Sequence, residues 1–337
     1  MIKIGVLCPS EIAIRRFMPA LMKVNNVVFV GIAHASEEEW YGSISSNHDL
    51  TVLNTDFAKA KDFVNHFGGK VFNSYDEIIK SNEIDALYIP LPPGLHYKWA
   101  KKTLENGKHV LVEKPSTTSL KDTEDLVSVA ETKNLVIYEN YMFNFHSQIS
   151  SIEKMIDDKL IGDIRLYRIT FGFPFRGITD FRYNKKLGGG ALLDCGGYTL
   201  KLANRLLKHN PKVVEHTLNY VNDFDVDIYG SGTLKNDLNQ VAQISFGMDN
   251  SYKCELEVWG SKGVIFTNRI LTAPVDYNPV VKIIVGNDEK TITLSSDDSF
   301  KKSIEYFINC ISNETLRNNT YIDLIEQAKM VEVFKEN

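Results

Sequence analysis

Three side chains with complementary proton chemistry stand out in two segments of the chain. Lys114 lies just after the apolar run His109–Val112, which predicts a buried strand. Asp194 and Tyr198 are four residues apart in the glycine-rich segment 188–198, which predicts the opening of a helix and places both side chains on one face. A lysine ammonium stabilises a developing alkoxide, and a nearby phenol can donate a proton. The three residues therefore predict proton transfer at an oxygen while a cofactor carries a hydride.

Each of these residues also has an ordinary structural interpretation. Lys114 alone is typical of a surface lysine, Tyr198 of a core-facing aromatic and Asp194 of a helix cap. Their joint occurrence at this spacing favours the functional interpretation over the three separate structural ones.

The elements that must position Lys114 are predicted by the first 140 residues, where strands and helices alternate. Apolar strand patterns occupy residues 2–7, 27–32, 71–72, 86–89, 109–112 and 136–138. This alternation predicts a Rossmann-type α/β domain over 1–140, with a doubly wound parallel sheet. Open sheets of this kind bind ligands at the carboxyl ends of their strands, which is where Lys114 is expected.

The pattern changes after about residue 150. Longer alternating strands are predicted at 165–172, 213–221, 225–234, 240–246, 254–259 and 264–267, followed by a hairpin around Gly286 and Asn287. Helices are predicted at 149–156, 300–311 and 321–334. Residues 141–337 are therefore predicted to form an α+β domain with a large open antiparallel sheet that has one covered face.

The first strand leads into a turn that lacks the usual glycines of a dinucleotide site. Cys8, Pro9 and Ser10 take their place, and Pro9 removes one backbone donor. Glu11 would repel a phosphate unless it points away. Because Cys8 and Ser10 are small, a pyrophosphate contact remains possible, against the alternative of a turn without a ligand. The candidate cofactor contacts here are Leu7, Cys8, Ser10 and Ile12.

The end of the second strand is where a Rossmann site holds the adenosine ribose. Here it carries His34 and Ser36, followed by the acidic triplet Glu37–Glu39, with neither an acid nor an arginine at the strand tip. His34 and Ser36 are candidate cofactor contacts, and the triplet is interpreted as a solvated loop. The preference between NAD and NADP stays open. Residues 37–55, ahead of a helix expected at 57–67, are interpreted as a polar insertion near the cofactor.

Composition excludes several classes of protein. With 38 basic and 43 acidic residues among 337, the net charge is −5. The sequence has no stripe of basic residues, so a nucleic-acid partner is not expected. The four cysteines form no CxxC pair and the histidines show no metal spacing, so neither disulfides nor a metal site are expected. No apolar run is long enough for a membrane span and no signal peptide is evident, so a cytoplasmic location is expected.

These segments together carry a family resemblance. The segment Pro92–His96, the run Glu113-Lys114-Pro115 and the segment Gly188–Asp194 resemble the Gfo/Idh/MocA oxidoreductases, the family of glucose-fructose oxidoreductase and inositol dehydrogenase. The resemblance spans essentially the whole length. Within that family, the chain is similar to the nucleotide-sugar 3-ketoreductases of deoxysugar pathways. That similarity is carried by Arg15-Arg16, Pro19-Ala20, Asn140–Phe143, His146, Asp180–Tyr183 and the tyrosine at position 198.

The resemblance implies roles for the candidate residues. It implies that Lys114 lies beside the nicotinamide and hydrogen-bonds the reacting oxygen, that Tyr198 donates the proton, and that Asp194 orients the lysine or the sugar. Further cofactor contacts are expected from Leu91, Pro92, His96 and Glu113. Substrate contacts are expected from Asn140, His146, Arg182 and Tyr198. A guanidinium such as that of Arg182 suits the phosphates of a nucleotide-linked substrate.

Three functions remain open at this point. The leading hypothesis is an NAD(P)H-dependent reductase of a keto sugar, which we expect to be nucleotide-linked. The second is a dehydrogenase of a free sugar or cyclitol, with Tyr198 as the base. The third is a catalytically silent protein that binds a dinucleotide or sugar on the same fold. The resemblance also implies a homo-oligomer, a dimer or tetramer, formed through an uncovered apolar face of the second sheet.

Overall fold

The computed structural model describes residues 1–221 and 223–336, and these residues form two compact units. The first unit comprises Met1–Asn140 and Ser303–Ile325. The second comprises Tyr141–Lys302 together with the residues from Glu326 onward. Part of the chain's C-terminal region therefore belongs to the first unit, outside the range 1–140 that the strand pattern delimits.

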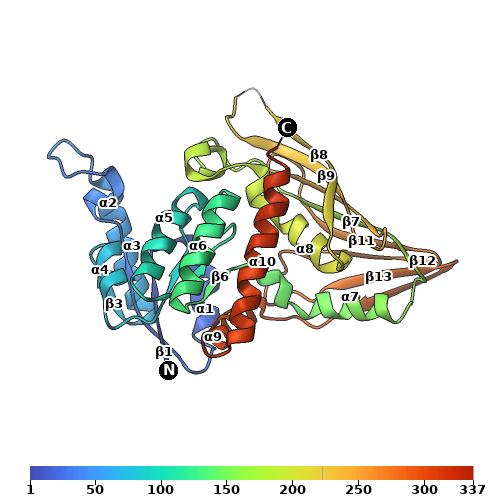
Figure 1. The fold of residues 1–337 in the computed structure, drawn as a ribbon, viewed down its shortest axis with the longest axis horizontal. Coiled ribbons are helices and arrows are strands. Elements are labelled where there is room, and N and C mark those ends of the chain that lie inside the picture. Colours follow the sequence, from blue (N-terminus) through green and yellow to red (C-terminus); the bar gives the residue numbers. More distant parts are fainter. Residues whose placement is uncertain (222, 337) are drawn as a thin grey trace. The chain divides into compact units, whose positions relative to one another are not determined.

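The first unit contains a six-stranded sheet in the order β3-β2-β1-β4-β5-β6, and each adjacent pair is parallel. The chain that forms this sheet runs from blue to green in Figure 1. The strands are β1 (Ile2–Val6), β2 (Val27–Ala33), β3 (Lys70–Phe72), β4 (Ala86–Ile89), β5 (His109–Val112) and β6 (Ile137–Glu139). Most residues of β4 and β5 are buried, as expected for strands covered on both faces. The prediction of a doubly wound parallel sheet is confirmed. The strand order reverses between β1 and β4, the point where such sheets bind a dinucleotide.

Helices lie between the strands of the first unit, and the one expected at 57–67 begins earlier, at Thr51. They are α1 (Met18–Leu21), α2 (Glu37–Tyr41), α3 (Thr51–Phe67), α4 (Tyr75–Lys80), α5 (Pro93–Glu105) and α6 (Leu120–Lys133). Two of them, α2 and the start of α3, occupy the segment 37–55 that the composition indicated to be a polar insertion. The segment is polar, as the sequence indicates, but part of it is helical, because Ser36 and Glu39 have the spacing of a capping box and start α2. That it is an insertion near the cofactor stays a prediction.

Buried polar contacts tie the returning segment to the first unit. The hydroxyls of Tyr138 and Ser303 are 2.9 Å apart, and Arg317 Nη2 donates to Asn134 Oδ1 at 2.5 Å. The segment belongs to two helices, α9 (Ser299–Ser312) and α10 (Glu314–Val333). The unit boundary therefore falls inside both helices.

The second unit is built on an eight-stranded sheet in the order β14-β13-β12-β11-β7-β10-β9-β8. The strands are β7 (Ile164–Gly172), β8 (Lys212–Tyr220), β9 (Asp227–Lys235), β10 (Val241–Gly247), β11 (Lys253–Gly260), β12 (Gly263–Asn268), β13 (Val280–Val285) and β14 (Asp288–Thr293). Every adjacent pair is antiparallel except β7 and β10, which are parallel. The predicted antiparallel sheet is thus confirmed with one parallel pair, and β13 and β14 form the predicted hairpin.

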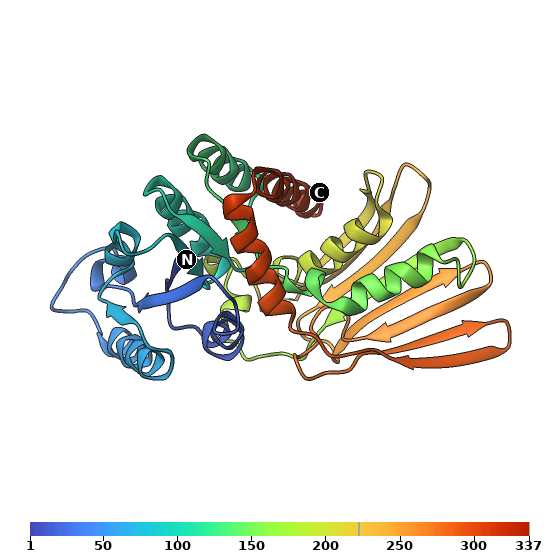
Figure 2. The same cartoon turned by 90° about the horizontal axis from the view of Figure 1, so that it is seen from below.

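Two helices, α7 (Ser147–Asp157) and α8 (Gly197–Leu207), cover one face of this sheet, as Figure 2 shows. Inward-facing Tyr167, Ile169 and Phe171 of β7 are buried in the same apolar cluster as these helices. The alternation of buried and exposed residues along β7 therefore follows from the covering of one face only.

The other face of the second sheet is more polar than expected. Arg168 Nη1 lies 2.9 Å from Glu257 Oε1, and the hydroxyls of Thr170 and Ser245 are 3.0 Å apart. Trp259, next to Arg168, is 48% exposed. The expectation of a large uncovered apolar face is corrected accordingly, because the outward positions of neighbouring strands pair polar side chains across the sheet.

Among the residues that the structure describes, no helix has the length and apolar character needed to cross a membrane.

Candidate functional site

The residues expected to bind a cofactor follow the carboxyl ends of adjacent strands in the first unit. Leu7 and Cys8 follow β1, Leu91 and Pro92 follow β4, and Glu113 and Lys114 follow β5. Because parallel strands present their carboxyl ends at one edge of the sheet, these residues are brought together there. Lys114 thus occupies the position that the strand pattern predicts for it.

Glu113 is held by two donors beside Lys114. Its Oε1 accepts a hydrogen bond from the Tyr88 hydroxyl at 2.7 Å and another from Asn140 Nδ2 at 2.8 Å. Burial raises the pKa of Glu113, while these hydrogen bonds and the Lys114 charge act to lower it. Asn140 in turn accepts from the Ser303 hydroxyl at 2.8 Å. Both ends of the Asn140 amide are therefore used within the first unit, although we expected it to contact a substrate.

His96 joins the segment after β4 to the residue that follows Lys114. Its imidazole is fully buried, with Nε2 2.6 Å from the Leu91 carbonyl oxygen and Nδ1 2.7 Å from the Pro115 carbonyl oxygen. Burial lowers the pKa of His96 to about 4, despite the two carbonyls, which act in the opposite direction. The ring is then neutral near pH 7 and donates to only one of the two carbonyls. The Lys114–Pro115 peptide bond beside it is cis.

A pH dependence of stability follows from this burial. His96 should bind a proton in the unfolded chain below its ordinary pKa of 6.5 but in the folded chain only near pH 4. The free energy of unfolding therefore falls as the pH drops from about 6.5 towards 4. This one group accounts for a fall of about 3 kcal/mol. We expect His96→Gln to flatten this part of the stability profile, measured by urea unfolding at pH 7 and pH 4.5. A profile as steep as that of the unaltered protein would contradict the assignment.

The turn after β1 leads directly into a helix, and the small residue Ser10 accepts a hydrogen bond from the backbone of that helix. Ser10 Oγ accepts a hydrogen bond from the Ala13 backbone nitrogen at 3.2 Å, and the chain then winds as a π-helix over Ala13–Phe17. Ile12 lies in the helical turn before it. Glu11 is exposed and pairs with Arg15 at 2.5 Å. The carboxylate that would have opposed a phosphate is therefore partly neutralised by its own helix.

Cys8 contributes a neutral thiol to this turn. Its Sγ donates to the Pro90 carbonyl oxygen at 3.7 Å, which links the ends of β1 and β4, while the Leu7 nitrogen donates to the Tyr88 carbonyl at 2.9 Å. Burial, followed by the Asp56 carboxylate, raises the pKa of Cys8 to about 12. The thiol therefore adds no negative charge where a pyrophosphate would lie.

The end of β2 is occupied by a capped helix. Ser36 Oγ accepts from the Glu39 nitrogen at 3.3 Å, and Glu39 Oε2 accepts from the Ser36 nitrogen at 2.9 Å. Glu39 also accepts from the backbone nitrogens of Tyr75 and Asp76 at 2.9 and 2.8 Å. The acidic triplet is thus the first turn of α2, and its interpretation as a solvated loop is wrong for Glu39.

The catalytic candidates Asp194 and Tyr198 lie in the second unit, where Asp194 is paired with Arg182. Arg182 Nε donates to Asp194 Oδ2 at 2.6 Å, and its Nη1 donates to Asp180 Oδ1 at 3.1 Å. The Asp194 side chain is 13% exposed and that of Arg182 is 22% exposed. Although burial acts to lower it, the two carboxylates raise the pKa of Arg182 above its ordinary value. Asp180, which sequence reasoning did not single out as a site residue, completes this cluster.

The segment that carries Asp194 is fixed by close backbone packing. Gly190 has φ +123°, and a Cβ atom there would lie 2.4 Å from Asp227 Oδ1. Asp227 Oδ2 accepts from the Leu192 nitrogen at 2.6 Å, at the start of a π-helix over Leu192–Gly196 that continues into α8. The predicted helix opening is confirmed, but its first turn is wider than an α-helical one. π-turns of this kind occur frequently at functional sites.

Tyr198 lies on α8 among aromatic rings. It packs edge-on against Tyr141, with centroids 5.1 Å apart, and against Phe171 at 5.4 Å, and the residue is 8% exposed. Lys201, one turn later and 4% exposed, places its ammonium 5.6 Å from the Tyr141 ring centroid. A cation buried close to these phenols is a functional candidate that sequence reasoning missed, although its three-residue spacing from Tyr198 was a usable signal.

His146 stands just before α7. Its Nδ1 accepts from the Gln148 nitrogen at 3.1 Å, so the proton of the neutral ring is on Nε2. This Nε2 is buried and has no hydrogen-bond partner. A buried donor without a partner is unusual, and a ligand oxygen would satisfy it.

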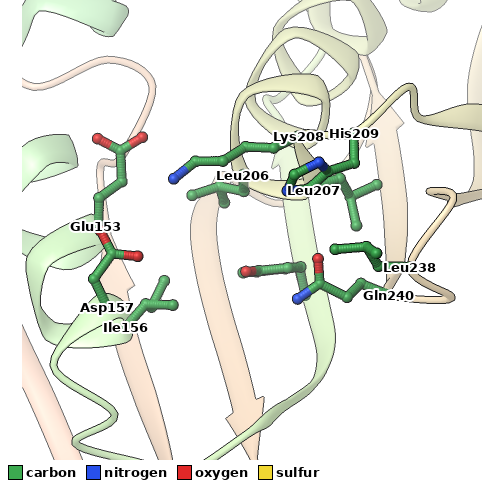
Figure 3. Close-up of a pocket in the computed structure, with 10 residues that line it drawn as sticks. Glu153, Ile156, Asp157, Leu206, Leu207, Lys208, His209, Leu238 and Gln240 are labelled. Atoms are coloured by element: carbon green, nitrogen blue, oxygen red, sulfur yellow. The ribbon is translucent and has the colours of Figure 1, made fainter.

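A separate cavity of about 200 Å³ lies in the second unit and contains none of the predicted site residues (Figure 3). Side chains of α7, including Glu153 and Asp157, face Lys208 and His209 across it. The Glu153 carboxylate is already paired with Arg205 at 2.8 Å. Within residues 1–221 and 223–336, no cluster of three or more His, Cys, Asp or Glu could hold a metal ion.

Family models match both halves of the chain. Residues 25–141 match the model of an oxidoreductase family with an NAD-binding Rossmann fold, and residues 149–266 match the model of the GFO/IDH/MocA C-terminal domain. The first match covers β2 to β6 of the sheet of the first unit but not β1, and the second covers β7 to β11 and part of β12.

Curated relatives and solved structures extend the match to almost the whole chain. The dTDP-3,4-didehydro-2,6-dideoxy-alpha-D-glucose 3-reductase of Actinomadura kijaniata is 33% identical over 99% of this chain and 95% of its own. The enzyme of the same name from Saccharopolyspora spinosa is 32% identical, over 98% and 96%. A 3-ketoreductase from Actinomadura kijaniata, solved with NADP and TDP-benzene, superimposes with a TM-score of 0.89, at 33% identity and covering 99% and 97% of the two chains.

Proposed function

The chain belongs to the Gfo/Idh/MocA family of oxidoreductases, and we propose that it reduces a keto group on a nucleotide-linked sugar with a reduced nicotinamide cofactor. The observation that carries this proposal is the similarity to dTDP-sugar 3-reductases over 99% of the chain. The catalytic candidates Lys114, Asp194 and Tyr198 are all present, which favours an enzyme over a silent binding protein on the same fold.

The edge of the first sheet fits the proposed cofactor. The Cys8 thiol is neutral, and Glu11 is paired with Arg15, so no uncompensated charge opposes a pyrophosphate at the first turn. Residues after β1, β4 and β5 would hold the cofactor, including Leu7, Leu91 and Lys114. Bound there, a reduced nicotinamide supplies the hydride.

We assign the electrostatic role to Lys114 and the role of the general acid to Tyr198. The Lys114 ammonium stabilises negative charge that develops on the carbonyl oxygen, and the Tyr198 hydroxyl donates the proton that completes the alcohol. Glu113 limits the movement of the Lys114 backbone, because two hydrogen bonds fix its own carboxylate. Arg182 holds Asp194 through a 2.6 Å ion pair, so we assign it to orienting Asp194 rather than to a substrate phosphate. His146 stays a predicted substrate contact, and its buried Nε2 has no hydrogen-bond partner.

The proposal is tested by turnover with defined sugars. Purified protein is mixed with reduced nicotinamide cofactor and a dTDP-linked 3-keto-deoxysugar, and the loss of nicotinamide absorbance is followed. We expect turnover with the dTDP-linked sugar and at least about 100-fold lower kcat/KM with the free keto sugar, because binding of the nucleotide is lost. Oxidation of free sugars or cyclitols at comparable efficiency would support the dehydrogenase alternative instead.

We propose that the protein forms a homo-oligomer, a dimer or tetramer, through the open face of the second sheet. The family resemblance is the basis of this proposal, and the exposed aromatic side chains of Trp259 (48%) and Tyr229 (44%) are candidates for the contact. Light scattering at micromolar concentration should give at least twice the monomer mass of 38.2 kDa, and Trp259→Asp should shift the mass towards the monomer. A monomer for the unaltered protein would refute the proposal. The expected cytoplasmic location stays a prediction.

A further inference from the structure

We propose that the end of β2 rejects a 2′-phosphate on the adenosine ribose, so that the chain uses NADH in preference to NADPH. The inference rests on the proposed function, because it concerns the cofactor of the same reaction. It is drawn from the charges and contacts of the first unit between β2 and α4.

The position of the ribose follows from the strand order. In the order β3-β2-β1-β4-β5-β6, the dinucleotide crosses the strand ends at the reversal between β1 and β4. Its adenosine half then extends over the end of β2, where a carboxylate favours the ribose of NAD and an arginine favours the 2′-phosphate of NADP. β2 ends at Ala33, so the residues that follow it decide between the two cofactors.

The chain after β2 is acidic and lacks strong cations. Residues 34–58 contain five acidic residues and neither lysine nor arginine. Lys59, the first cation beyond them, lies 3.2 Å from Asp56 and is already paired. A 2′-phosphate, which carries close to two negative charges, would meet the carboxylates of this segment, and the segment itself supplies no guanidinium or ammonium to balance it.

Backbone donors that a phosphate would need are already used by a carboxylate. Glu39 accepts from the nitrogens of Ser36, Tyr75 and Asp76, at 2.9, 2.9 and 2.8 Å. The Ser36 hydroxyl accepts from the Glu39 nitrogen at 3.3 Å. Glu39 therefore occupies the place of an anion at the junction of α2 and α4, and a second anion there would have to displace it.

Glu37 adds a second fixed negative charge. Its Oε1 accepts from the Ser45 nitrogen at 2.8 Å and lies 2.8 Å from His48 Nδ1. The hydrogen bond from the Ser45 nitrogen, followed by that from His48, lowers the pKa of Glu37, so the carboxylate is ionised at neutral pH. Unlike a disordered acidic loop, this segment cannot move its charge away from a bound phosphate without breaking these bonds.

His34 offers no compensating donor. Its Nδ1 lies 3.0 Å from the Ala35 carbonyl oxygen, so Nδ1 carries a proton and donates it there. The remaining nitrogen, Nε2, is buried and has no hydrogen-bond partner. The one histidine at the strand tip therefore presents no exposed N–H group to a phosphate.

The test compares the two cofactors on the full-length protein by nicotinamide fluorescence. We expect the dissociation constant for NADH to be at least about tenfold lower than that for NADPH, with the difference shrinking as salt screens the carboxylates. Glu38, in the first turn of α2, is exposed, so Glu38→Arg adds a cation without removing a described side-chain contact. This variant should lower the dissociation constant for NADPH at least about fivefold and change that for NADH by less than about twofold.

The matched control is Glu124→Arg, the same change of charge on the exposed side of α6. It should move neither dissociation constant by more than twofold. Equal or tighter binding of NADPH by the unaltered protein would overturn this inference and leave the proposed reductase intact. Binding of neither cofactor by folded protein would overturn both.

Discussion

Replacing Lys114 by methionine is expected to lower kcat with the keto sugar by about 10²- to 10³-fold, the usual cost of losing one group that stabilises an oxyanion. Methionine keeps an unbranched apolar stem of similar length and removes only the charge that the proposal requires. The cofactor dissociation constant should stay within about threefold, because strand ends other than β5 supply most of the proposed contacts. The measurement is steady-state turnover beside a fluorescence titration of the cofactor.

Two controls make the Lys114 result interpretable. Lys121→Met, on the exposed side of α6, removes a lysine outside the proposed site and should leave kcat unchanged. Thermal unfolding of Lys114→Met shows whether the fold survives, since the variant also removes a charge that lowers the pKa of the buried Glu113. If a folded Lys114→Met protein turned over at the normal rate, the oxyanion role would be wrong.

Replacing Tyr198 by phenylalanine is expected to lower kcat by about 10²- to 10⁴-fold, the range for loss of a positioned general acid. The ring should keep its packing against Tyr141 and Phe171, at 5.1 and 5.4 Å between centroids, so little stability is lost. Steady-state rates test the expected loss of kcat, and urea unfolding tests the expected stability.

Tyr183→Phe is the matched control for Tyr198. The Tyr183 hydroxyl donates to the Met248 carbonyl at 2.7 Å, so its removal costs a buried hydrogen bond in the same unit. The free energy of unfolding should fall by about 1 kcal/mol while kcat stays within a few-fold. A larger loss of kcat in Tyr183→Phe than in Tyr198→Phe would indicate that structure, rather than proton donation, explains both.

The parallel sheet was predictable because its strands are buried on both faces. Continuous apolar runs such as His109–Val112 and Ala86–Ile89 identify these strands, and the rule for parallel sheets then places Lys114 at the carboxyl edge. The β13–β14 hairpin was equally predictable from the sequence, since Gly286 adopts φ +59° at its turn. Each of these features is set by residues close together in the sequence.

Features set by distant residues were not predictable in this way. Asp227 fixes the start of the helix that carries Asp194 from 35 residues away, through the Leu192 nitrogen. The parallel pairing of β7 with β10 depends on the whole connection between them. The pairing of Arg182 with Asp194 likewise needs the loop to fold back, which no local pattern records.

For the segment after β2, residue spacing was more informative than composition. The segment after β2 is polar, and polarity alone suggested a solvated loop. The capping-box spacing of Ser36 and Glu39 was present in the sequence and outweighed that polarity. The same spacing explains why the acidic triplet is structured, which is the basis of the expected preference for NADH.

We propose above all that this chain catalyses hydride transfer to the carbonyl carbon of a nucleotide-linked sugar. The most direct test is to run the reaction with reduced cofactor carrying deuterium at the transferable position of the nicotinamide, and to locate the label in the product by mass spectrometry and NMR. We predict one deuterium per product molecule, bound to the carbon that bore the keto group. A product without deuterium, or no reduction of any nucleotide-linked keto sugar by folded protein with cofactor bound, would contradict the claim.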